Sequence, residues 1–337
     1  MSDLIPPFST TGIGSVPHTH ADDACQLILR TFDIPFWPQL PRRSFREAMI
    51  AQYSEGMPYV NVRDEDGSVW VSRDLSDELE RFYESCGENS RIAISEDHAF
   101  GLHTFLRLIK GRRFPILKGH VTGPVTFTLG LKDRDGKLVY FDEELREISS
   151  MLLQAKARWQ ADILRQHAER VIVFIDEPIL SAVGSSSYLG VDSAELLRLL
   201  RGVVSAVESA GGISGIHCCG RADWPLVMQS GAKILSFDAY EYFQTLALYP
   251  EEIREFLQAG GYLAWGIVPT SESIRDVDDE RLKTVLSAAF DTLSTHVEAG
   301  MLRSRSLLTP SCGTASRSIE ETIKVFQLLV RLKEEML

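Results

Sequence analysis

Short apolar runs alternate with amphipathic helical stretches along the chain, and this alternation limits the possible folds more than any other feature. Residues 171–175 form a continuous apolar run, which is typical of a strand covered on both faces in a parallel sheet. Residues 142–167 carry apolar side chains close to the 3.6-residue period of a helix. The expected strands are residues 10–14, 35–37, 115–121, 171–176, 213–217, 234–238, 263–268 and 306–309. The expected helices are residues 21–31, 44–55, 98–110, 142–167, 193–210, 224–230, 250–259, 279–299 and 319–336.

Eight strands with helical connections predict an α/β fold, a single (β/α)8 TIM barrel. An open doubly wound sheet is the alternative, but it usually has a glycine-rich phosphate turn after its first strand. Here Pro17 closely follows Gly12 and Gly14 and blocks the turn into a helix. Residues 59–72 alternate in polarity around an Asp66-Gly67 turn, which predicts a β-hairpin between the second and third barrel strands.

The composition is that of an ordinary soluble globular protein. Apolar residues make up 44% and charged residues 24% of the 337 positions, and no linker divides the chain, so residues 1–337 are expected to form one domain. The net charge of −12 argues against nucleic acid or an anionic membrane as the main partner. No signal peptide, membrane-spanning run or secreted disulfide pattern is evident, so a cytoplasmic location is expected.

Three metal-ligand side chains follow expected strands. His217 and Cys219 lie at the end of one apolar run, and Cys312 lies at the end of another. Zinc prefers such nitrogen and sulfur ligands, and three protein ligands leave a fourth position free, as in catalytic zinc sites. The alternative is a pair of buried reduced thiols beside a core histidine. Because barrel enzymes place their chemistry at the carboxyl ends of the strands, the zinc interpretation is favoured.

Two adjacent acids, Asp176 and Glu177, end the apolar run at 171–175. Side chains at the end of a strand point in different directions, so at most one of the two faces a pocket. That acid would bind a substrate ammonium or accept a proton. The alternative for either acid is a helix cap or a surface ion pair. By the same alternation, Cys218 is expected to point away from Cys219 and pack in the core.

Five segments resemble the catalytic domain of cobalamin-independent methionine synthase, in the same order and with similar spacing. They are residues 11–17 (TGIGSVP), 122–126 (TGPVT), 175–178 (IDEP), 217–219 (HCC) and 310–313 (PSCG), and the resemblance covers essentially the whole chain. The family belongs to the barrel superfamily that includes uroporphyrinogen decarboxylase. The resemblance implies a zinc-bearing barrel in which the metal binds homocysteine as a thiolate that attacks a methyl group.

The resemblance also implies a role for each matching residue. Its zinc ligands would be His217, Cys219, Cys312 and, as the fourth, Asp238. Asp238 is favoured over Glu241 because it directly ends the apolar run at 234–237. Asp176 would hold the homocysteine ammonium and act as the catalytic acid group of the site. The segment that cradles the substrate carboxylate would be Ile13, Gly14 and Ser15.

The chain departs from the family at the methyl-donor side. The family places a folate-stacking tryptophan where this chain has Gly130, and its Asp-x-His after the seventh strand is missing at 265–269. The expected function is therefore a zinc-dependent S-methyltransferase that converts homocysteine to methionine, with methylcobalamin or another methylcorrinoid as donor and a corrinoid protein as candidate partner. The alternatives are a methyl-tetrahydrofolate-dependent methionine synthase, a uroporphyrinogen decarboxylase-like enzyme without metal, and a non-catalytic corrinoid-binding or zinc-binding protein.

Overall fold

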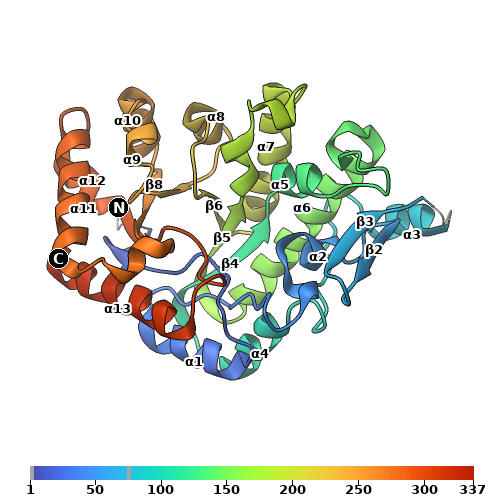
Figure 1. Ribbon diagram of the computed structural model, residues 1–337, viewed down its shortest axis with the longest axis horizontal. Helices are drawn as coiled ribbons and strands as arrows, with labels where there is room; N and C mark the ends of the chain where they lie inside the picture. Colours follow the sequence, from blue (N-terminus) through green and yellow to red (C-terminus); the bar gives the residue numbers. More distant parts are fainter. Residues whose placement is uncertain (1–3, 74–76) are drawn as a thin grey trace.

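A curved parallel sheet occupies the centre of the molecule, and helices lie around it (Figure 1). The computed structural model describes residues 4–73 and 77–337, and within them the sheet has seven strands in the order β1-β9-β8-β7-β6-β5-β4. The strands are β1 (Ser9–Thr10), β4 (Phe114–Thr122), β5 (Ala168–Asp176), β6 (Ile213–Cys218), β7 (Ile234–Asp238), β8 (Tyr262–Val268) and β9 (Ser306–Pro310). The predicted α/β architecture is confirmed, and each of these strands overlaps an expected one.

The predicted closed barrel is only approximate, because no ladder joins β1 to β4. Residues 36–39 occupy the eighth position through two isolated parallel bridges, Phe36 to Lys118 and Ser15 to Gln39. Further along β4, the backbone N–H of His120 donates to Gln160 Oε1 at 2.8 Å, and its carbonyl accepts from Gln160 Nε2 at 2.8 Å. A helix side chain therefore takes the backbone groups that a neighbouring strand would otherwise bind. We refer to residues 36–39 and their two bridges as the seam.

Alternate residues of each strand face two different cores. On β5, Ile172 and Phe174 belong to the cluster inside the barrel, whereas Val171, Val173 and Ile175 belong to the larger cluster between sheet and helices. A strand that is buried on both faces needs apolar residues at every position, which explains the continuous run in the sequence.

Thirteen α-helices lie in the described ranges. They are α1 (Ala21–Thr31), α2 (Met49–Ser54), α3 (Asp77–Ser85), α4 (Phe100–Leu108), α5 (Pro124–Gly130), α6 (Glu143–Arg165), α7 (Ser193–Ser209), α8 (Trp224–Gln229), α9 (Phe243–Leu246), α10 (Pro250–Gln258), α11 (Asp279–Ser294), α12 (Ala299–Ser304) and α13 (Ile319–Met336). The expected helix at 279–299 ends early and is followed by α12, and α3, α5 and α9 were not predicted. In residues 4–73 and 77–337, none of the helices has the length and apolar character that a membrane crossing requires.

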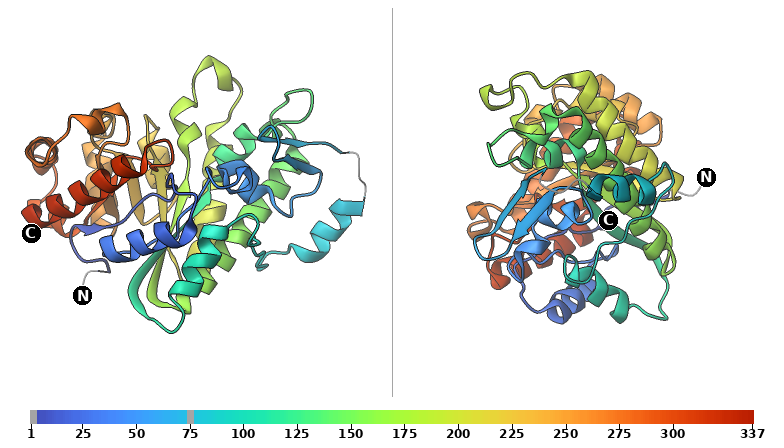
Figure 2. Two further views of the ribbon diagram at one scale, coloured as in Figure 1. Left: turned by 60° about the horizontal axis from the view of Figure 1, so that its bottom comes forward. Right: turned by 90° about the vertical axis from the view of Figure 1, so that its right-hand side faces the viewer.

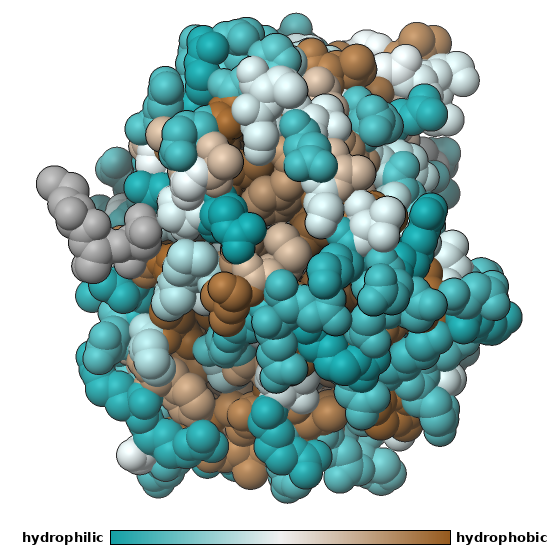
Figure 3. Space-filling view, turned by 90° about the vertical axis from the view of Figure 1, so that its left-hand side faces the viewer, coloured by the Kyte–Doolittle hydropathy of each residue, from teal (hydrophilic) through white to brown (hydrophobic). Residues whose placement is uncertain are grey.

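The predicted hairpin is confirmed. β2 (Val60–Arg63) pairs antiparallel with β3 (Ser68–Val71), and Gly67 in the turn has a φ of 62°. The hairpin lies beside the barrel, next to α2 and α3 (Figures 1 and 2). On the opposite side, which α11, α12 and α13 form, hydrophilic side chains dominate and apolar ones are scattered in smaller patches (Figure 3).

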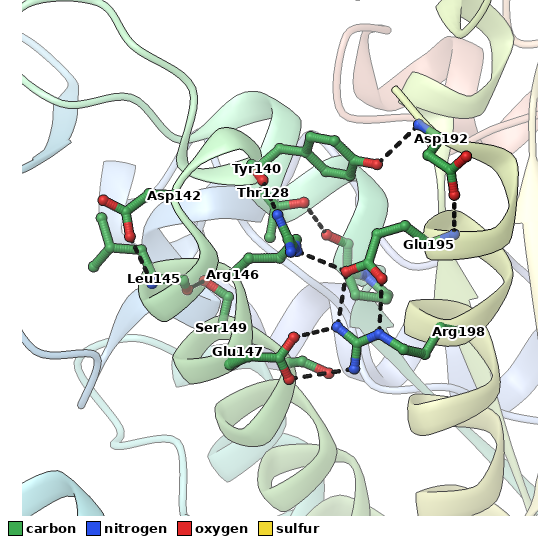
Figure 4. A network of polar contacts seen from close by, with 12 residues as sticks. Thr128, Tyr140, Asp142, Leu145, Arg146, Glu147, Ser149, Asp192, Glu195 and Arg198 are labelled. Carbon is green, nitrogen blue, oxygen red and sulfur yellow. Dashed lines mark hydrogen bonds and ion pairs between the residues drawn. The ribbon is translucent and has the colours of Figure 1, made fainter. Parts of the chain in front are cut away.

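A polar network joins α6 to α7 (Figure 4). Glu195 on α7 forms an ion pair with Arg146 on α6, with 2.6 Å between Oε1 and Nε, and accepts a hydrogen bond from Arg198 Nε at 2.8 Å. Arg198 also pairs with Glu147 of α6. The backbone N–H that precedes α7, at Asp192, donates to the Tyr140 hydroxyl at 3.1 Å. The long connection from β5 to α7 begins at the pocket described below. These contacts hold its far end, at the start of α7.

Candidate active site

Six of the eight predicted site residues line one small cavity, and Gly14 and Asp238 are not among its lining residues. It has a volume of about 80 Å³ and is lined by Ile13, Ser15, Gln39, Met49, Asp176, Pro178, His217, Cys219, Cys312 and Gly313. The cavity lies where β5, β6 and β9 end and where the chain leaves β1. This is the face of a TIM barrel at which active sites form.

Three of the predicted metal ligands lie close together. Among the described residues, one ligand atom each from His217, Cys219 and Cys312 lies within 4.8 Å of the other two. His217 and Cys219 share a face because side chains alternate along β6. Cys218 between them packs in the core outside the barrel, as predicted. Strands far apart in sequence but close in the ring therefore supply the nitrogen and sulfur atoms.

The imidazole of His217 is held in one orientation. Its Nδ1 lies 2.9 Å from the Ser236 hydroxyl, and its buried Nε2 has no partner among the residues that the structure describes. Metal-binding histidines characteristically use one ring nitrogen for such a support and the other for the metal. A hydrogen bond from the Cys312 thiol, followed by the effect of His217, lowers the pKa of Cys219 to about 4. The same hydrogen bond, together with burial, raises the pKa of Cys312.

The predicted fourth ligand, Asp238, is buried at the end of β7 but does not belong to this close group. Its Oδ1 accepts the backbone N–H of Glu241 at 2.8 Å, and burial raises its pKa to about 6. Glu241 instead accepts the Ser271 hydroxyl at 2.7 Å. Asp238 as a fourth ligand therefore stays a prediction.

Asp176 and Glu177 point in different directions. Asp176 lines the cavity, pairs in register with His217, and has a buried Oδ1 without a partner in the described ranges. Burial raises the pKa of Asp176 above its ordinary value, and the neighbouring His217 and Lys118 act in the opposite direction. Glu177 accepts the backbone N–H groups of Val125 at 2.9 Å and Thr126 at 2.7 Å, in the first turn of α5. As expected from the sequence, only one of the two acids faces the cavity; ammonium binding by Asp176 stays a prediction.

In the segment from Ile13 to Ser15, every backbone carbonyl accepts a hydrogen bond, whereas the backbone N–H groups have no acceptor among the described residues. The carbonyl of Ile13 accepts from Lys118 Nζ at 2.6 Å, that of Gly14 from the Gln39 N–H at 3.1 Å, and that of Ser15 from the Thr314 N–H at 2.8 Å. None of the three N–H groups of the segment donates to a described residue. Consecutive free N–H groups are a common way to bind an anion.

Four lining residues, Gln39, Met49, Pro178 and Gly313, were not predicted as site residues, although Gly313 lies in the 310–313 segment. Gln39 lies two residues beyond the expected strand at 35–37 and so on the same face as its last residue, which is a signal that sequence reading could have used. Met49 lies within the expected helix at 44–55, and no sequence motif marks it as a site residue. Pro178 belongs to the 175–178 segment that was noted for its acids alone.

Comparisons with known proteins give a likeness of fold. No family model matches the sequence, and no curated protein matches it. The structure is similar to that of a B12-independent methionine synthase from Shewanella sp. W3-18-1 in complex with selenomethionine, with a TM-score of 0.62, 16% identity and 98% of each chain covered. The pneumococcal virulence factor StrH has a TM-score of 0.47 and 9% identity over 98% of this chain and 83% of that chain, too distant to argue from.

One expectation finds no support in these comparisons. The methionine synthase of similar fold is independent of B12, so the comparison gives no support to methylcobalamin as the donor. The corrinoid-protein partner remains untested. At 16% identity the likeness concerns the fold, so the chain has the fold of methionine synthase-like barrels.

Proposed function

We propose that this protein is a zinc-dependent thiol S-methyltransferase that methylates homocysteine to methionine. The observation that carries the proposal is the shared cavity of the His217, Cys219 and Cys312 cluster, a buried carboxylate and a segment of free backbone N–H groups. An α-amino acid with a thiol side chain has three matching groups: a sulfur, an ammonium and a carboxylate. The proposal is supported by the likeness to a methionine synthase fold.

The cluster fits zinc by the chemistry of its donors. One imidazole with an unpartnered nitrogen and a pair of thiols, one of them with a strongly lowered pKa, are the ligand types that zinc selects. His217, Cys219 and Cys312 would hold the ion and leave a position for the substrate sulfur. When bound, zinc would favour the thiolate form of that sulfur at neutral pH.

The chain's own groups would then position the amino acid. Asp176 would accept a hydrogen bond from its ammonium, and the N–H groups of Gly14 and Ser15 would donate to its carboxylate. A cavity of about 80 Å³ leaves little room for water around the sulfur. Orienting the nucleophile before reaction lowers the entropic part of the barrier. A metal-free decarboxylase has no use for this cluster, which is why that alternative is not favoured.

Zinc content is the first test. Purified protein should hold about one zinc per chain, and Cys219→Ser and Cys312→Ser should lose most of it. Cys218→Ala is the matched control, because this neighbouring thiol packs in the core and should not affect occupancy. Elemental analysis of the folded proteins measures the outcome, and full occupancy in both serine variants would contradict the assignment.

Ligand binding is the second test. Zinc-loaded protein should bind homocysteine at least about tenfold more tightly than homoserine, which differs in having a hydroxyl in place of the thiol. Calorimetry measures both affinities, and formation of methionine with methyl-tetrahydrofolate as donor tests the reaction. Equal affinity for the two amino acids would show that the sulfur is not recognised and would remove the basis of the proposal.

A further inference from the structure

A buried lysine lies beneath the cavity. Lys118 on β4 is fully buried, and its Nζ donates to the Ile13 carbonyl at 2.6 Å and lies 4.3 Å from the centroid of the Phe174 ring. On the same strand Thr122 pairs with Asp176, so Lys118 lies four residues deeper in the barrel than the level of the cavity. Burying an ammonium group is unfavourable without compensation, so a lysine at this position needs a reason.

The contact with Ile13 determines how the next peptide group points. The peptide bond between Ile13 and Gly14 is trans, and in a trans peptide the C=O and the following N–H point in opposite directions. A carbonyl held toward Lys118, inside the barrel, therefore turns the Gly14 N–H away from the interior. That N–H donates to no described residue, which leaves it free for a ligand.

A second side chain on the same face of β4 supports this segment. The ring of His120 stacks on Trp37 with 3.9 Å between centroids. A Cβ atom at Gly14 would lie 2.9 Å from Nδ1 and Cε1 of that ring, so the backbone of Gly14 rests directly on it. Burial holds the pKa of His120 well below its usual value, so the ring is neutral. Lys118 and His120 together fix the height and orientation of the segment.

We propose that Lys118 is a positioning residue: by holding the Ile13 carbonyl, it presents the free backbone N–H group of Gly14 to the carboxylate of an α-amino acid. The inference rests on the proposed function for the chemistry of the ligand. It does not require a charged lysine, because the ammonium and the neutral amine both donate hydrogen bonds. Burial lowers the pKa of Lys118 below its ordinary value, and the nearby Asp176 carboxyl opposes this shift.

The test compares two ligands that differ in one group. Methionine and its decarboxylated analogue, 3-(methylsulfanyl)propan-1-amine, are titrated into zinc-loaded wild type and Lys118→Met by calorimetry. Lys118→Met should bind methionine about tenfold or more weakly, because the backbone N–H is no longer held toward the charged carboxylate and loses its hydrogen bond to it. The variant should bind the amine as wild type does. Lys118→Gln, which keeps a shorter N–H donor, should recover part of the preference for methionine, and it replaces the Met variant if that one does not fold.

Lys156→Met is the matched control. Lys156 is also fully buried, but its Nζ lies 3.9 Å from Glu55, outside the residues that line the cavity. It should leave the ratio of the two affinities unchanged. An equal loss of both ligands in Lys118→Met, or no loss of either, would overturn the positioning role while the proposed function stood. Failure of wild type to bind either ligand would instead contradict the proposed function, and with it the ligand on which the inference rests.

Discussion

Asp176 and Glu177 are adjacent in sequence and serve different parts of the molecule. Asp176 faces the cavity, whereas Glu177 accepts two backbone N–H groups at the start of α5. Gly123 is part of the same arrangement, because a Cβ there would overlap the Glu177 side chain. The segments 122–126 and 175–178, which stand out separately in the sequence, are therefore two sides of one contact.

Replacement of Asp176 by asparagine should weaken amino-acid binding without removing zinc. A charge-assisted hydrogen bond to the ammonium contributes on the order of 1.5–3 kcal/mol, so methionine should bind about 10- to 150-fold more weakly. 4-Mercaptobutanoic acid, which has no amino group, should bind wild type and Asp176→Asn equally. Calorimetry on zinc-loaded protein measures both. If the two proteins bind methionine alike, another group holds the ammonium.

The roles of single residues could be predicted from the sequence only in part. The grouping of His217, Cys219 and Cys312 could be predicted, because strand ends in a barrel meet at one face. The place of Asp238 could not, since a single turn after β7 gives its carboxylate a backbone partner at Glu241. Lys118 carried no signal: a lysine inside an apolar strand is understood only once Ile13 is seen above it.

At the scale of elements, one carboxylate, that of Glu195 on α7, is shared by an arginine of α6 and an arginine of α7. Glu195 binds Arg146 and Arg198, and its side chain is 20% exposed, whereas Glu147 is 40% exposed and binds Arg198 alone (Figure 4). The connection from β5 to α7 includes Pro178, which lines the cavity, and ends where α7 begins. Glu195 is therefore part of a half-buried network, whereas Glu147 forms a surface ion pair.

Glu195→Gln should lower the free energy of unfolding by about 1–3 kcal/mol, because it removes the negative charge that two arginines share in a partly buried place. Glu147→Gln is the matched control and should change it by roughly 0–1 kcal/mol. Chemical denaturation of the two variants and wild type provides the comparison. Equal effects would mean that the network stabilises the helix pair no more than a surface ion pair does.

At the scale of the whole molecule, the elements were predictable and the seam was not. Continuous apolar runs such as 171–175 identify buried strands, and the Asp66-Gly67 turn identifies the hairpin. Where the ladder is missing, Gln160 near the C-terminal end of α6 binds the backbone of His120. Gln160 and His120 are 40 residues apart in the chain. No local sequence pattern indicates that a side chain will take the place of a strand.

Buried acids should give the molecule a characteristic pH dependence of stability. Burial raises the pKa of Glu47 from 4.5 to about 7, so the folded state holds that proton more tightly than the unfolded state. Its contribution is present at pH 5 and lost as the pH rises toward 8, which amounts to about 2–3 kcal/mol. Wild type should therefore lose that much stability relative to Glu47→Gln between pH 5 and 8. Chemical denaturation across the range measures it, and parallel profiles would contradict the raised pKa.

A ligand bound across the seam is expected to slow the local opening of the barrel at that place. Residues 36–39 lie between the strand that leads to Ser15 and the strand pair that ends at Asp176, and they are held by two isolated bridges. An amino acid bound to the Gly14–Ser15 donors at one end and to Asp176 at the other would span this weakly joined part of the ring. Local opening at the seam would then require ligand release, so the amide of Gln39 should exchange hydrogen faster than those within β5 in free protein and slow markedly with methionine bound. Substrate would in this way complete the wall of the barrel that encloses it.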